Sequence, residues 1–148
     1  MSEYKLTSAI VELSAAMSWE AAKLEWHLNE VYEADEPETC LCGHFPIVEL
    51  CILGNKANGN EATVGNCCVK RFIGLPSDKI FQAVKRVRKE TSKSLNAEAI
   101  RHAFDRNWLT AWERDFYFDV MRKRNLTLKQ QEKKKQINEL VLQRMKRK

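Results

Sequence analysis

The chain has 148 residues, about the length of one domain. Hydrophobic residues make up 44% of it, enough for a packed core. No apolar run approaches the ~20 residues of a membrane span, so we expect no membrane partner. The opening Met-Ser-Glu-Tyr-Lys has neither the basic start nor the apolar core of a secretory signal. We therefore expect a cytoplasmic protein, in which thiols stay reduced.

The formal net charge of +5 conceals a strong asymmetry. Residues 1–68 contain 3 Lys/Arg and 11 Asp/Glu, a net charge of −8, whereas residues 69–148 contain 22 Lys/Arg and 9 Asp/Glu, a net charge of +13. A basic half of this kind attracts nucleic acid or an acidic protein surface. The alternative is that the two halves complement each other within one fold, because solvated Lys/Arg helices are common.

The first predicted element is a helix over residues 6–33, where apolar side chains recur at helical spacing. Ser18 is a suitable N-cap within this range, so the segment is predicted to form two helices or one kinked helix. An acidic run follows at residues 33–38, and Pro37 favours a loop there.

A β-hairpin is predicted next. Residues 45–53 are rich in β-formers, an Asn-Gly dipeptide is a strong tight-turn signal, and residues 62–64 form the returning strand. A second turn at residues 65–66 leads into residues 67–72. The hairpin therefore carries cysteines at both of its ends.

Four helices are predicted in the basic remainder of the chain. Asn96 and Thr127 are suitable N-caps for the second and the last of them. The four helices cover residues 77–90, 97–106, 109–123 and 128–146.

All five cysteines fall between residues 40 and 68, with one histidine among them. An odd number of cysteines fits a closed set of disulfides poorly, so metal binding is the leading explanation. Cys40 and Cys42 supply a first ligand pair for tetrahedral zinc, in a Cys-x-Cys-Gly turn that is tighter than the common Cys-x-x-Cys-Gly. Cys68 returns from the far end of the hairpin. The alternative is a group of buried free thiols without metal.

The fourth zinc ligand is open among three residues. We favour His44, which is close enough in sequence to fold over the metal. Cys51 and Cys67 are the other candidates, although Cys51 is also explained as a small buried side chain and adjacent extended cysteines point apart. The predicted set is Cys40, Cys42, His44 and Cys68, holding a structural Zn²⁺ that supports a hairpin too small to stand alone.

The motif Cys40-Leu41-Cys42-Gly43-His44, followed by Val64-Gly65-Asn66 and Cys68-Val69-Lys70-Arg71-Phe72, resembles a pattern found in small uncharacterised bacterial and phage-borne proteins. The pattern is Cys-x-Cys-Gly, then Val-Gly-x-x-Cys-Val-x-x-Phe, and it covers about 33 residues, from Cys40 to Phe72. The resemblance implies a zinc-finger-like β module of no settled activity. It also favours Cys68 over Cys67 as a ligand.

Clusters of Lys and Arg in the second half of the chain indicate a surface that binds phosphate groups. Arg122-Lys123-Arg124 and Lys133-Lys134-Lys135 extend it. An aromatic group at residues 108–118 could stack on bases, but its helical spacing favours core packing. The predicted nucleic-acid-binding residues are Lys70, Arg71, Lys85, Arg86, Arg88 and Lys89.

The predicted fold class is α+β, mostly α, with a zinc-stabilised β-hairpin inserted between an N-terminal helix and a C-terminal helical bundle. One domain over residues 1–148 is expected, made of segments 1–35, 36–75 and 76–148. No catalytic motif is present, so we expect a non-enzymatic binding protein for nucleic acid. The alternatives are a phage or mobile-element inhibitor or adaptor acting on a host protein, and a zinc-dependent hydrolase or nuclease.

Overall fold

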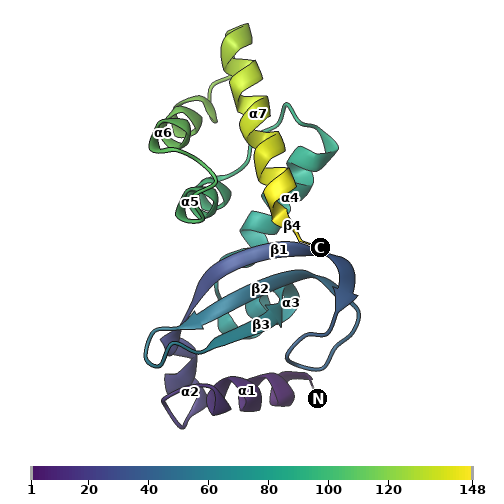
Figure 1. Cartoon of the computed structure of the whole chain (residues 1–148), viewed down its shortest axis with the longest axis vertical. Coiled ribbons are helices and arrows are strands. Elements are labelled where there is room, and N and C mark those ends of the chain that lie inside the picture. Colours follow the sequence, from purple (N-terminus) through teal and green to yellow (C-terminus); the bar gives the residue numbers. More distant parts are fainter. Residues whose placement is uncertain (1, 148) are drawn as a thin grey trace. The chain divides into compact units, whose positions relative to one another are not determined.

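The computed structural model describes residues 2–147, which divide into two compact units (Figure 1). Unit 1 comprises residues 2–78 with residue 147, and unit 2 comprises Lys79–Lys146. The boundary lies close to residue 76, where the basic helical segment is predicted to begin.

Unit 1 contains the N-terminal helices, the long strands and short helical turns. Its elements are α1 (Ser2–Glu12), α2 (Trp19–Ala22), the 3-10 turn η1 (Lys23–Glu25), β1 (Trp26–Glu38), β2 (Ile47–Asn55), β3 (Glu61–Gly65), α3 (Asn66–Cys68) and the π-helical turn η2 (Val69–Ile73). The helix α4 (Ser77–Lys89) starts at the boundary. It is followed by α5 (Ala97–Asp105), α6 (Ala111–Val120), α7 (Leu128–Met145) and the two-residue strand β4 (Lys146–Arg147).

The predicted fold class is confirmed. The protein is α+β and mostly α, and an antiparallel sheet lies in the chain between the N-terminal helix and the C-terminal helices. Within residues 2–147 we find no helix with the length and apolar character that a membrane span requires.

The three long strands lie in the order β3-β2-β1, and each neighbouring pair is antiparallel. The predicted hairpin is confirmed, since Leu50 pairs with Gly65 and Leu53 pairs with Ala62. Because both outer strands are antiparallel to β2, they run parallel to each other. Their carboxyl ends therefore lie at the same edge of the sheet, where β2 begins.

The prediction of a helix over residues 6–33 is wrong for the second half of that range. The helix α1 ends at Glu12, Ser18 caps the short α2 as expected, and the chain is extended from Trp26 onward. The acidic residues 33–38, predicted to form a loop, also belong to β1.

A β-bulge explains why the sequence of this strand lacks the regular alternation of apolar and polar residues. The register of β1 against β2 shifts between Leu28 and Glu30, so side-chain alternation is interrupted in the middle of the strand. The buried residues Trp26 and Val31 pair with Asn55 and Cys51 and so share one face of the sheet, although they are five residues apart in sequence. Tyr32 is buried on the opposite face. Pairing with β2, which is distant in sequence, outweighs the helical spacing.

The helices of unit 2 agree with their predicted positions because each carries its own local signals. The Asn96 side chain accepts a hydrogen bond from Ala99 N (2.9 Å), and Thr127 Oγ1 accepts one from Gln130 N (3.2 Å). Both predicted N-caps are confirmed. The predicted third helix is shorter than expected and begins after Thr110, which caps α6. The apolar stripe of α4 is buried and consists of Ile80, Phe81, Val84 and Val87.

A buried polar network joins α6, α7 and the link between α4 and α5. Tyr117 Oη donates to Asn138 Oδ1 (2.6 Å) and accepts from Leu95 N (2.8 Å). Asn138 Nδ2 donates to Thr91 O (2.9 Å) and Lys93 O (2.8 Å). The side chains of Tyr117 and Asn138 are fully buried. The network therefore holds the link against the helices.

We expect the free energy of unfolding of unit 2 to fall as pH rises from 10 to about 12. Burial raises the pKa of Tyr117 from its ordinary 10.0 to about 12, so the folded state favours the neutral phenol. This stabilisation is complete below the pKa that Tyr117 has in the unfolded chain. It is lost as pH rises through the pKa that Tyr117 has in the folded protein. Denaturant titrations across this range measure the decline. Tyr117→Phe should make it shallower, and an identical decline in the variant would contradict the assignment.

Candidate metal centre and basic surface

Three cysteine sulfur atoms meet in unit 1. The Sγ atoms of Cys40, Cys42 and Cys68 all lie within 4.8 Å of one another, and the three residues are 4%, 4% and 8% exposed. None of these three cysteines forms a disulfide. Tetrahedral zinc with Zn–S bonds of about 2.3 Å places neighbouring sulfurs about 3.8 Å apart. The three sulfurs could therefore hold a metal ion after only small adjustments.

The sheet topology brings these cysteines together. Cys40 follows the end of β1, and Cys68 lies in α3, directly after β3. Because β1 and β3 end at the same edge of the sheet, residues 28 positions apart in sequence become neighbours.

A tight turn brings Cys42 back to Cys40. Gly43 N donates to Cys40 O (2.8 Å), and Cys40 N donates to His44 O (2.9 Å). Gly43 has φ +91°, a conformation that favours glycine. The Cys-x-Cys-Gly spacing is thus compatible with two convergent thiols.

The residues after β3, at and beyond the turn predicted at residues 65–66, form the helical turns α3 and η2. Successive side chains in a helix diverge by about 100°. Cys68 is therefore buried in the cysteine group, whereas Cys67 is exposed and lies outside it. Helical geometry separates these two adjacent residues.

Backbone N–H groups donate hydrogen bonds to two of the three sulfur atoms. Gly65 N donates to Cys40 Sγ (3.2 Å), and His44 N donates to Cys42 Sγ (3.4 Å). A Cβ at Gly65 would lie 3.4 Å from Cys40 Sγ and 3.1 Å from Ile47 Cδ1, so glycine permits the close approach.

Without a cation the Cys68 thiol resists ionisation. Burial raises the pKa of Cys68, and the neighbouring thiols of Cys42 and Cys40 raise it further. A divalent cation reverses this preference because it takes the place of the protons. Lys5 adds positive charge nearby, since its Nζ lies 3.3 Å from the position of a Cβ at Gly43. The sequence contains no signal for Lys5, which lies on α1, far from the cysteines in sequence.

The remaining predicted or alternative ligands lie outside the sulfur group. His44 is exposed, and its contribution to the group is its main-chain N–H. Cys51 lies in β2 and is fully buried, and burial raises the pKa of its thiol to about 12. The alternative that Cys51 is a small buried side chain agrees with this position.

The predicted nucleic-acid-binding residues belong to both units. Lys70 and Arg71 lie in η2 of unit 1, where Lys70 Nζ is 3.3 Å from Asp78 Oδ2 and the Arg71 guanidinium lies 5.1 Å from the centre of the Phe72 ring. The other four lie in unit 2, on the exposed face of α4: Lys85, Arg86, Arg88 and Lys89.

Unit 2 carries most of the positive charge. Residues 79–146 contain 18 Lys/Arg and 8 Asp/Glu, a formal net charge of +10. Arg86 is partly engaged within the unit, since its Nε and Nη2 donate to Ser94 O (3.1 and 2.9 Å). The cationic surface is therefore a property of one compact helical unit.

No family model, curated protein or solved structure matches the chain. The resemblance to small bacterial and phage-borne proteins stays a prediction.

Proposed function

We propose that the chain is a non-enzymatic, zinc-containing protein that binds nucleic acid through unit 2. The observation that carries this proposal is the formal charge of +10 on residues 79–146. Phosphate groups are attracted to such a surface whatever the base sequence, because binding releases counterions condensed on the nucleic acid.

Zinc is the metal that best suits the cysteine group. Thiolate ligands select soft or borderline metals, and zinc requires no redox chemistry. Cys40, Cys42 and Cys68 would hold the ion, with His44 on the same turn as the favoured fourth ligand. The ion would join the end of β1 to α3 and so connect both outer strands. We assign it a structural role because its three proposed cysteine ligands are buried.

An exposed aromatic pair in unit 2 supports contact with unpaired bases. Trp112 is 61% exposed and stacks on Phe116, with ring centroids 5.3 Å apart and an interplanar angle of 12°. Lys133 Nζ lies 5.8 Å from the centre of the Trp112 ring. Core packing was predicted for this aromatic group and describes the buried Tyr117, whereas Trp112 is available to a ligand. Bases of single strands stack on such rings.

We expect a fluorescein-labelled single-stranded oligonucleotide to bind the protein with an affinity that falls steeply as salt concentration rises. For single strands the slope of log K against log salt is about −0.7 per phosphate contacted, so several contacts give a slope of about −3 or steeper. Fluorescence anisotropy over a salt series measures both quantities. The absence of binding at ~50 mM salt, where electrostatic affinity is high, would contradict the proposal. A stoichiometric protein that co-purifies from the host would favour the adaptor alternative.

A further inference from the structure

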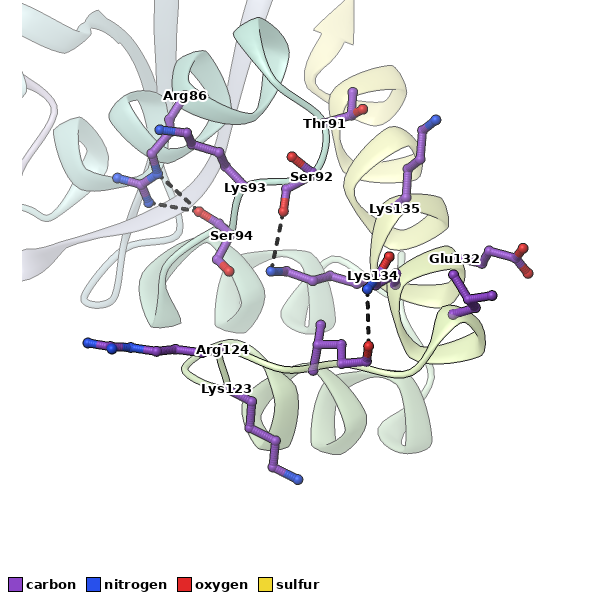
Figure 2. A pocket seen from close by; sticks show the side chains of 13 residues that line it. Arg86, Thr91, Ser92, Lys93, Ser94, Lys123, Arg124, Glu132, Lys134 and Lys135 are labelled. Carbon is purple, nitrogen blue, oxygen red and sulfur yellow. Dashed lines mark hydrogen bonds between the residues drawn. The ribbon is translucent and has the colours of Figure 1, made fainter.

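Unit 2 contains a recess lined mainly by cationic and polar side chains (Figure 2). Its volume is about 1030 Å³, at the upper end of the range of ligand sites in proteins. Of its 13 lining residues, six are Lys or Arg and one, Glu132, is acidic. The cations are Arg86, Lys93, Lys123, Arg124, Lys134 and Lys135.

Several segments bring these cations together. They come from α4, from the link between α4 and α5, from the link between α6 and α7, and from α7. Asn138 holds the first link through its hydrogen bonds to Thr91 O and Lys93 O, and Arg86 holds it through Ser94 O. The recess is thus built on anchored backbone.

Lys134 is the most deeply placed of the six cations. It is 8% exposed, and Figure 2 shows its side chain directed toward Ser92, whose carbonyl accepts a hydrogen bond from Lys134 Nζ at 3.5 Å. Among residues 2–147 no carboxylate lies within 4.0 Å of this ammonium group. Burial lowers the pKa of Lys134, as expected for a cation without a counterion. An anionic group in the recess would offset this cost.

The lining indicates which anion fits. None of the 13 lining residues is aromatic, so the recess offers no ring on which a base could stack. Several cations in one recess suit neighbouring phosphates better than a single carboxylate. A duplex is stiff, with a persistence length of about 150 bp, whereas a single strand can bend its backbone into a recess and reach Lys134.

We propose that this recess binds the phosphate backbone of single-stranded nucleic acid, with the bases directed outward. The inference rests on the proposed function, since it names the place on unit 2 where the strand lies. It also moves the main contacts away from the α4 residues Lys85, Arg88 and Lys89, which do not line the recess.

Two double variants with equal charge change test the assignment. Arg124→Gln/Lys135→Gln removes two exposed cations of the recess, and Lys129→Gln/Arg144→Gln removes two exposed cations elsewhere on unit 2. We expect the recess variant to bind labelled oligothymidylate at least about tenfold more weakly, because two charge-assisted contacts are lost. Its salt slope should become shallower by about 1.4, corresponding to two phosphates. The control should lose less than about threefold at ~0.15 M salt, where distant charges are screened.

The outcomes separate this inference from the proposed function. Equal losses in the two double variants would overturn the recess while leaving nucleic-acid binding intact. No binding by the unmodified protein would overturn both. Stronger binding of a duplex of the same length would overturn the single-strand assignment.

Lys134→Met provides a readout that a purely structural role would not produce. We expect the variant to raise the Tm of the free protein, because a buried charge without a counterion is removed, and to weaken oligonucleotide binding by about tenfold. A fall in both Tm and affinity would make Lys134 a structural residue and overturn its place in the recess.

Discussion

Cys68→Ser is expected to abolish metal binding and to destabilise unit 1. The hydroxyl is a poor zinc ligand, and its introduction removes the proposed ligand in α3 and with it the connection that the proposed ion would make between the ends of β1 and β3. Because zinc binding and folding are coupled, the loss amounts to several kcal/mol and a fall in Tm of more than about 10 °C for a unit of this size. Metal analysis of the purified protein and thermal unfolding followed by circular dichroism measure both effects.

Cys67→Ser is the matched control. It changes the adjacent residue in the same helical turn, but Cys67 is exposed and its sulfur lies outside the group. We expect about one zinc per chain to be retained and Tm to change little. His44→Ala in the same series tests the fourth ligand. If the imidazole binds the ion, this variant should lose zinc to a chelator more readily than the unmodified protein. An unmodified protein without metal would rule out the zinc centre and leave a group of buried free thiols.

Asn138→Leu is expected to destabilise unit 2 by about 3 kcal/mol or more, because each buried group left without its hydrogen bond costs about 1–3 kcal/mol. The substitution removes the acceptor of Tyr117 Oη and the donor to Thr91 O and Lys93 O. A leucine can fill the space but cannot satisfy these partners. Urea unfolding measures the change in free energy.

Gln136→Leu also replaces a side-chain amide by leucine, at an exposed position of α7, and should stay within about 0.5 kcal/mol of the unmodified protein. Equal effects of the two substitutions would contradict the importance of the network. Because Asn138 anchors the link that carries Thr91, Ser92 and Lys93, its loss should also weaken oligonucleotide binding. The Asn138 side chain therefore supports both the stability of unit 2 and the backbone that carries part of the basic recess.

Helices α4 to α7 were predictable because their signals are local. Asn96 and Thr127 sit immediately before apolar stripes of helical period, and each makes the hydrogen bond that its position implies. The β2–β3 hairpin was predictable for the same reason, since its turn lies within a few residues of both strands.

The strand β1 was not predictable by the same reasoning. Its apolar residues fit a helical spacing, and the bulge between Leu28 and Glu30 removes the alternation that would have indicated a strand. Its partner β2 starts at Ile47, so the pairing that decides its conformation is not local.

The amino-acid sequence already contains the chemistry that is available: a group of cysteines between residues 40 and 68, and a chain whose second half is basic. It also determined the local helices, because capping and apolar periodicity act over a few residues. Which three thiols meet depends on the folded sheet, because β1 and β3 run parallel and end at one edge of it. The tertiary structure also determines which cations share a recess, because residues 86–93 and residues 123–135, which are distant in sequence, must pack before their charges become neighbours.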